Sequence, residues 1–173
     1  EPELSGINLS NNNSNVFGIG KFNSEANQVL ATTVLNNTNG LVLTENSAIS
    51  APYQLVNMQP GYIPLGKGNF YADSLDEYVF RYKTNNTIVI KKFGDALPSS
   101  SSNEVSALEK TFVVSKNLAF KGIADFNNDG YSDILWQKPN GVLAILYISE
   151  NTGMWQDVVG LTAREDVIGV GDF

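Results

Sequence analysis

The sequence contains neither cysteine nor histidine, and this double absence removes several common kinds of active site. Without histidine there can be no Ser-His-Asp triad, and without cysteine there is no thiol nucleophile. The usual zinc sites also depend on these two residue types. The lack of cysteine gives no support for disulfides, although it does not by itself fix a cellular compartment.

An enzyme built from the remaining residues would have to depend on a pair of carboxylates, as glycosidases do. Asp73, Asp76 and Glu77 form the one conspicuous cluster of that kind. The repeat pattern described below places this cluster in a degenerate cation loop. We therefore expect the cluster to be structural and the chain not to be an enzyme.

Basic residues are also scarce. The chain has 11 Lys and Arg against 18 Asp and Glu, a net charge of −7. A chain of this charge repels phosphate backbones, so nucleic acid and anionic membrane surfaces are not expected partners. No apolar run reaches the roughly 18 residues needed for membrane insertion. Charged residues make up only 17% of the chain, and such a neutral-polar surface suits a secreted or cell-surface protein.

The most informative stretch that is present runs from residue 125 to residue 133. Side chains with oxygen donors fall at positions 1, 3, 5 and 9 of this loop, and Gly130 at position 6 permits a sharp turn. Hard cations such as Ca²⁺ take six to eight oxygen ligands, which a short loop supplies from alternate positions. The spacing predicts a calcium site formed by Asp125, Asn127, Asp129, the Tyr131 carbonyl and Asp133.

This stretch is not an EF-hand. Trp136 stands where position 12 of an EF-hand carries a bidentate Glu. The flanking segments are apolar and partly β-branched, which is typical of strands. The sequence therefore predicts a cation loop between two strands.

Two earlier segments resemble this loop less well. In the second, Asn69, Tyr71, Asp73 and Glu77 fall on the four ligand positions. Tyr71 is a poor third ligand and a serine replaces the glycine, so we expect at most a weak metal site formed by Asn69, Asp73 and Glu77. The first segment offers Lys21, Asn23 and Glu25. Because Lys21 brings a positive charge to the first ligand position, no calcium is expected there.

The loops belong to an internal repeat of about 50 residues. Four segments end in Phe22, Phe70, Phe126 and Phe173, which are 48, 56 and 47 residues apart. The third repeat reads as strands over about 118–126, 133–137, 141–148 and 154–160, with Asn140-Gly141 as a hairpin turn. A stripe with helical spacing appears only near Glu104 to Lys110.

Four strands in each repeat of this length are typical of a β-propeller blade. The predicted fold class is therefore all-β, with blades of four antiparallel strands. Three repeats cannot close a ring, so we expect a part of a larger propeller or assembly, completed by further blades from the same chain or another subunit. The predicted divisions are an N-terminal strand or linker (1–13), repeats at 14–60, 61–116 with an insert at 98–103, and 117–164, and the start of a fourth repeat (165–173).

The third repeat resembles the FG-GAP/VCBS family of calcium-loop propeller repeats, which are related to integrin α-chain blades. The resemblance rests on residues 122–136, from Gly-Ile-Ala-Asp to Ile-Leu-Trp, and on the following Asn140-Gly-Val-Leu-Ala-Ile-Leu146. It implies structural Ca²⁺ and an extracytoplasmic location. It also implies a role in adhesion, in lectin-like recognition or beside an enzyme.

We therefore expect a non-catalytic calcium-binding module that recognises a glycan or a protein at the cell surface. Two alternatives remain open: a structural subunit whose free strand edges pair with neighbouring chains, or an accessory domain of a larger hydrolase. Exposed aromatic rings could form sugar-stacking platforms. For Trp136 we favour core packing over such a role, and Trp155 is less settled because it begins an outer strand after a turn.

Overall fold

The structure is a computed structural model whose described residues are all strand, turn or loop, with no helix. Side chains are described for residues 61–92 and 108–158 and for positions 167, 169 and 170. Before residue 61 only the backbone of four strands is described. Within these ranges no helix has the length and apolarity needed to cross a bilayer.

In the part of the chain that the structure describes, twelve strands form three antiparallel four-stranded sheets, each built from strands consecutive in the sequence. The first sheet contains β1 (Ser14–Gly20), β2 (Val29–Val34), β3 (Gly40–Glu45) and β4 (Gln54–Asn57). The second contains β5 (Tyr62–Gly68), β6 (Glu77–Tyr82), β7 (Thr87–Lys92) and β8 (Leu108–Val113). The third contains β9 (Ala119–Ala124), β10 (Asp133–Gln137), β11 (Leu143–Ile148) and β12 (Gly153–Val158). For the described residues, the predictions of an all-β fold and of four-stranded antiparallel sheets are confirmed.

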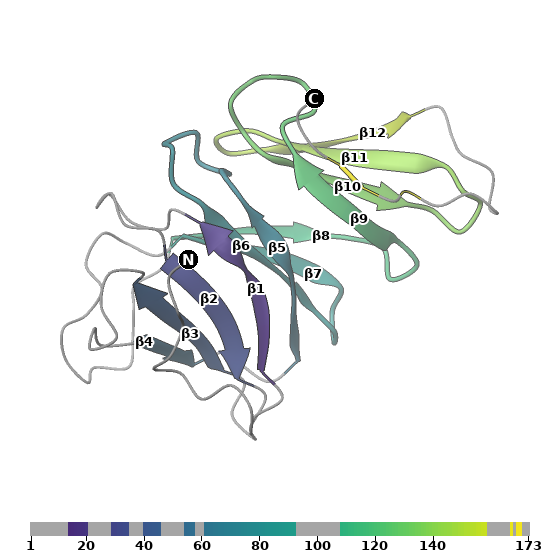
Figure 1. Cartoon of the computed structure of the whole chain (residues 1–173). Coiled ribbons are helices and arrows are strands. Elements are labelled where there is room, and N and C mark those ends of the chain that lie inside the picture. Colours follow the sequence, from purple (N-terminus) through teal and green to yellow (C-terminus); the bar gives the residue numbers. More distant parts are fainter. Residues whose placement is uncertain are drawn as a thin grey trace.

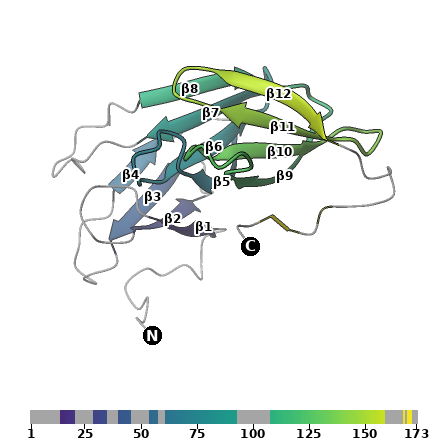
Figure 2. The same cartoon turned by 90° about the horizontal axis from the view of Figure 1, so that it is seen from above.

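The three sheets follow one another along the molecule, as Figures 1 and 2 show. Their first strands lie closest to one another, with β1 beside β5 and β5 beside β9. The outer strands β8 and β12 form the edges of the second and third sheets.

Each sheet carries a β-bulge at a corresponding place. One extra residue interrupts the pairing of the first strand with the second: Phe17 in β1, Leu65 in β5 and Lys121 in β9. These three positions are 48 and 56 residues apart, the same spacings that separate Phe22, Phe70 and Phe126. A bulge bends its strand and increases the local twist, so the three sheets are deformed in the same way.

The core lies between the second and third sheets. Val79, Ile88 and Ile90 pack from the second sheet against a group from the third. That group comprises Ile134, Trp136, Leu146 and Ile148, and all four are at most 1% exposed. The core packing expected of Trp136 is therefore confirmed.

The hairpin turn predicted at Asn140-Gly141 is confirmed, and the second sheet has a matching turn at Asn85-Asn86. Asn86 and Gly141 adopt positive φ angles of 54° and 87° in the turns before β7 and β11. The Asn85 and Asn140 side chains each accept a hydrogen bond from the amide two residues later, and this bond closes the turn.

The stripe of helical spacing noted near Glu104 to Lys110 does not form a helix in its described part. Leu108–Val113 is strand β8, paired with β7 along its whole length. The matching positions in the repeat predict that Phe22, Phe70 and Phe126 are equivalent and buried. Phe70 is fully buried, but Phe126 is only partly so, because Phe70 has the third sheet packed over it. Phe22, Phe173, the 98–103 insert and residues 1–13 lie outside the described residues.

Candidate functional site

The 125–133 loop joins β9 to β10 and turns sharply through two residues with positive φ. These are Asn128 at 58° and Gly130 at 89°. Asparagine and glycine are the residues that tolerate this region best. The sequence therefore folds the loop as predicted, with Gly130 at its tightest point.

Three of the predicted ligands converge on the inside of this loop. Asp125 Oδ1 and Asn127 Oδ1 both accept a hydrogen bond from the Asp129 amide, each at 3.2 Å. Asp125 Oδ2 accepts one from the Gly130 amide at 2.9 Å, and Asp129 Oδ1 accepts one from the Tyr131 amide at 2.9 Å. The Asn127 amide nitrogen donates to Asp129 Oδ2 at 2.9 Å. Each oxygen has a second lone pair, so these bonds position the side chains without exhausting their capacity as ligands.

Asp133, the predicted ninth-position ligand, has a different role in this structure. Its side chain is buried, with Oδ1 accepting the Ile148 amide at 2.9 Å and Oδ2 accepting the Phe126 amide at 3.0 Å. Burial raises the pKa of this carboxyl to about 6, and the negative charges of Asp129 and Asp125 contribute in the same direction. The Asp133 carboxylate thus links the start of the loop to the end of β11.

The described residues contain no group of three or more acidic, His or Cys side chains close enough together to hold a metal ion. The loop instead supplies two carboxylates and one amide oxygen, with Asp133 at its base. No lysine or arginine among the described residues pairs with Asp125 or Asp129. Carboxylate and amide oxygens are the type of donor that hard cations such as Ca²⁺ take.

The 69–77 loop, between β5 and β6, has the same backbone design. Ala72 and Ser74 take the positive φ angles, 53° and 67°, that Asn128 and Gly130 take in the other loop. Asn69 Oδ1 accepts the Asp73 amide at 3.2 Å, as Asp125 accepts Asp129. The carboxylate at the ninth position again accepts the phenylalanine amide, here Phe70 to Glu77 at 2.7 Å.

The two loops differ in the positive charge that surrounds them. In the 69–77 loop the Lys92 ammonium pairs with the Asp73 carboxylate. The Tyr71 ring lies beneath two ammonium groups, with Lys92 Nζ 5.1 Å and Lys110 Nζ 4.3 Å from the ring centre. Lysine therefore neutralises the carboxylate that a metal would need, and the donors Asn69, Asp73 and Glu77 do not form a free cation site in this structure.

The acidic residues considered as a catalytic cluster point to different partners. Asp73 pairs with Lys92, Asp76 pairs with Lys67 at 2.8 Å, and Glu77 is fully buried. A carboxylate mechanism would require two carboxyl groups that face a common space, and these three do not. The lysine-containing loop of the first repeat, with Lys21, Asn23 and Glu25, lies outside the described residues.

Glu77 should make the stability of the protein depend on pH. Burial raises the pKa of its carboxyl to about 7, against 4.5 for the unperturbed group, and the Asp76 charge adds to the rise. Its Oε1 has no hydrogen-bond partner in the described part of the chain. A raised carboxyl pKa favours the native state at low pH, and this contribution is lost as pH rises through about 7.

We expect Glu77→Gln to remove this dependence. Between about pH 4.5 and 7, the unfolding free energy of the wild type should fall relative to that of the Gln variant, which keeps an acceptor for the Phe70 amide. Urea titrations at several pH values measure the difference. A difference that stays constant across this range would contradict the assignment.

The two loops are tied to each other, a feature that the sequence did not reveal. The Ser132 amide donates to the Asn69 carbonyl at 2.7 Å, and the Asn69 amide donates to Ser132 Oγ at 3.0 Å. A Cβ at Gly68 would lie 2.7 Å from Ser132 Oγ and 2.8 Å from Ile123, so only glycine allows this approach. The 125–133 loop is thus part of the junction between the second and third sheets.

Lys110 forms a second tie across the same junction. Its ammonium donates to the Phe70 carbonyl at 2.7 Å and to the Ser149 carbonyl at 3.0 Å, and it lies 5.3 Å from the centre of the Tyr131 ring. Burial lowers the pKa of Lys110. The ammonium joins β8 of the second sheet to the turn before β12 of the third.

Comparison of the chain with known family profiles, with curated proteins and with solved structures found no match. The resemblance to the FG-GAP/VCBS family therefore stays a prediction from the sequence.

Proposed function

We propose that this chain is a non-catalytic, calcium-stabilised propeller-type module of a secreted or cell-surface protein, and that it recognises a glycan or a protein. The observation that carries the proposal is the contrast between two loops of the same design. One is neutralised by Lys92, and the other holds oxygen donors that pair with no lysine or arginine of the described residues.

An arrangement of the sheets as neighbouring propeller blades is supported by contacts that recur from sheet to sheet. A Cβ at Gly66 of the second sheet would lie 3.0 Å from Ile123 of the third. A Cβ at Gly122, the matching residue of the third sheet, would meet Val170, which matches Ile123 in the sequence repeat. We infer that Val170 stands where the first strand of a further blade would lie. The partial exposure of Phe126 agrees with this inference, since a further blade would cover it as the third sheet covers Phe70.

In this proposal calcium has a structural role. Asp125, Asn127 and Asp129 would hold the ion, with Asp133 and the Tyr131 carbonyl as the remaining predicted ligands. Two carboxylates held close together repel each other, and a divalent cation removes that repulsion. Because Ser132 of the same loop is bonded to Asn69, ordering the loop also secures the junction between the sheets.

Thermal melting with calcium and with EDTA tests the proposal. Free calcium at 100 times the dissociation constant should stabilise the native state by about 2.7 kcal/mol. For a chain of this size, that corresponds to a rise in Tm of about 5–10 °C. Asp129→Asn should abolish the rise, because it removes one carboxylate while keeping an acceptor for the Tyr131 amide.

Asp73→Asn is the matched control, since it makes the same change at the same position of the 69–77 loop. It should leave the calcium-dependent rise intact, whatever it does to the baseline stability. A wild-type melt that does not respond to calcium, or a rise that persists in Asp129→Asn, would refute the calcium assignment.

A second candidate function, a structural subunit, is favoured by the exposed apolar side chains on the edge strands. Leu108 and Val113 on β8 are 63% and 76% exposed, and Met154 on β12 is 63% exposed. Free strand edges with apolar side chains can pair with another chain. Light scattering separates the candidates, because a structural subunit would assemble far beyond the mass of the 18.8 kDa chain.

A further inference from the structure

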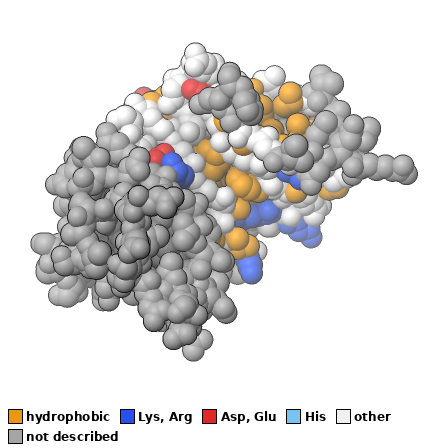
Figure 3. Space-filling model, viewed as in Figure 1, with side chains coloured by type: hydrophobic (Ala, Val, Ile, Leu, Met, Phe, Trp, Pro, Cys, Tyr) orange, Lys and Arg blue, Asp and Glu red, His pale blue; other side chains and the backbone are white. Residues whose placement is uncertain are grey.

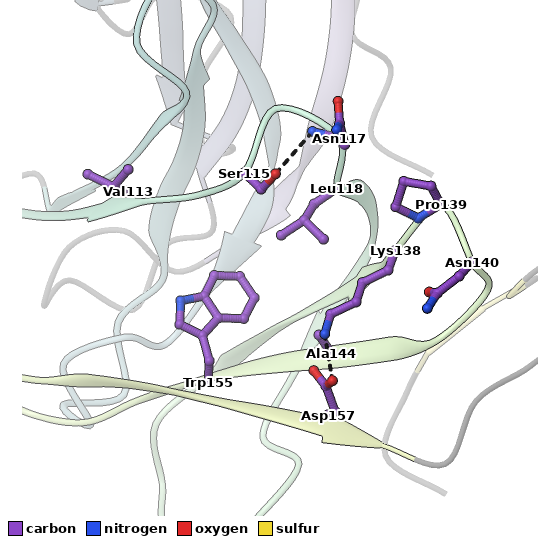
Figure 4. Close-up of a pocket in the computed structure, with 10 residues that line it drawn as sticks. All are labelled: Val113, Ser115, Asn117, Leu118, Lys138, Pro139, Asn140, Ala144, Trp155 and Asp157. Carbon is purple, nitrogen blue, oxygen red and sulfur yellow. Dashed lines mark hydrogen bonds and ion pairs between the residues drawn. The ribbon is translucent and has the colours of Figure 1, made fainter.

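A groove of about 540 Å³ lies at the opposite end of β10 from the 125–133 loop. One wall is the segment from Val113 to Leu118, which connects the second and third sheets. The other side consists of the turn at residues 138–140 together with β11 and β12. Figure 4 shows the side chains around this groove. Its volume falls within the range of small-ligand sites, about 300–1,000 Å³.

Trp155 supplies an aromatic platform in the groove. Its side chain is 40% exposed, whereas Trp136, the other tryptophan of the chain, is fully buried. In Figure 4 the indole ring of Trp155 rises from β12 towards the wall that contains Leu118. Together with Leu118 and Ala144 it gives the groove an apolar floor.

Polar groups surround this floor. At the rim of the groove, the Lys138 ammonium pairs with the Asp157 carboxylate at 2.5 Å, so these two charges neutralise each other. Asn140 uses its side-chain oxygen to accept the Val142 amide, which leaves its NH₂ group available. The Asn117 side chain makes no hydrogen bond within the described part of the chain, since only its backbone amide is bonded, to Ser115 Oγ.

Hydrogen bonds from the second sheet hold the 113–118 wall of the groove in place. The Arg81 guanidinium donates to the Leu118 carbonyl at 3.0 Å and to the Ser115 carbonyl at 3.1 Å, and it lies 5.6 Å from the centre of the Trp136 ring. The Val114 amide donates to the Asn86 carbonyl at 2.9 Å. The groove is therefore held in shape by the core of the protein, so little ordering is needed on binding.

We propose that this groove binds a neutral saccharide, with one sugar ring stacked on Trp155. A pyranose has an apolar C–H face and a periphery of hydroxyl groups, which matches an exposed indole bordered by amides and a balanced ion pair. An anionic sugar is disfavoured because Lys138 is already paired and the chain carries a net charge of −7. In the view of Figure 3, hydrophobic side chains are exposed beside lysine and arginine side chains on the described part of the surface.

This inference rests on the proposed recognition function but not on calcium. The 125–133 loop precedes β10 and the groove-lining turn follows it. Sugar binding should therefore persist in Asp129→Asn under conditions where that variant is folded. Failure of the calcium assignment and failure of the saccharide site are thus separate outcomes.

Two-dimensional ¹H–¹⁵N NMR of the full chain tests the proposal, because two tryptophans give two indole N–H signals. The probes are cellobiose, lactose, maltose, mannobiose and diacetylchitobiose, each added to about 10 mM, enough to load a site with a Kd near 1 mM. We expect at least one probe to shift the Trp155 signal in a saturable manner while the Trp136 signal stays in place.

Two variants make the test specific. Trp155→Ala should weaken binding of the active probe at least about tenfold, as expected when an aromatic anchor is removed, measured on the backbone signals of residues 115–118. Met154→Ala, on the opposite face of the same strand, should bind like the wild type. The unchanged Trp136 signal reports that each variant is folded.

Three results would overturn the proposal. The first is that no probe moves the Trp155 signal. The second is that binding is undiminished in Trp155→Ala. The third is that the Trp155 signal moves with protein concentration alone, which would identify a second copy of the chain as the occupant of the groove.

Discussion

Replacing Phe70 by alanine is expected to lower the unfolding free energy by about 3–5 kcal/mol, as for a large truncation in a packed core. Phe70 is fully buried and belongs to the cluster between the second and third sheets. Phe126→Ala, the same change at the matching position of the third repeat, should cost clearly less because Phe126 is only partly buried.

Urea denaturation of the two variants measures this difference. The pair is informative because both residues occupy the second position of a loop of the same design and donate the same backbone hydrogen bond. Equal losses would mean that Phe126 is as well covered as Phe70 in solution. In that case the third sheet would not have the open side from which we infer a further blade.

Lys110→Met should have the second-largest effect, a loss of about 1–3 kcal/mol. The variant keeps the apolar length of the side chain but leaves the Phe70 and Ser149 carbonyls without their donor. Both hydrogen bonds are partly buried, so each carbonyl keeps some access to water when its donor is removed. The substitution also removes the cation–π contact between the Lys110 ammonium and the Tyr71 ring.

Lys91→Met provides the control for this prediction. Lys91 lies on the neighbouring strand, and its ammonium pairs with Glu109, whose side chain is 42% exposed. Exposed pairs contribute about 0–1 kcal/mol, so the Lys91 variant should stay close to the wild type. Equal losses in the two variants would show that Lys110 acts as an ordinary surface charge.

The sequence predicted the third sheet well because its signals are local. The predicted strands at about 118–126, 133–137, 141–148 and 154–160 correspond to β9 to β12 with small differences at the ends. Alternating hydrophobic residues, an Asn-Gly turn and a loop rich in Asp and Asn each specify backbone geometry over a few residues. The repeat spacing then placed the 69–77 loop correctly, although its sequence matches poorly.

Interactions between distant residues could not be predicted in this way. Lys92 lies 19 positions from Asp73, and Lys110 lies 40 positions from the Phe70 carbonyl. Their positions depend on which strands become neighbours and on which face each side chain occupies. The loss of a free cation site at Asn69, Asp73 and Glu77 follows from Lys92, and no pattern within the loop itself contains that information.

Asp133 illustrates a different limit. The spacing predicts a side chain with oxygen donors at the end of the loop. The same residue is also the first residue of strand β10. The two roles compete for the same carboxylate, which in this structure accepts two backbone amides.

Isothermal titration with calcium tests the calcium site in the 125–133 loop, carried out on the full chain as wild type, Asp129→Asn and Asp73→Asn. We expect one bound ion for each wild-type chain, none for Asp129→Asn and one for Asp73→Asn. No calcium heat in the wild type, a second ion, or an Asp129→Asn variant that binds like the wild type would contradict this expectation.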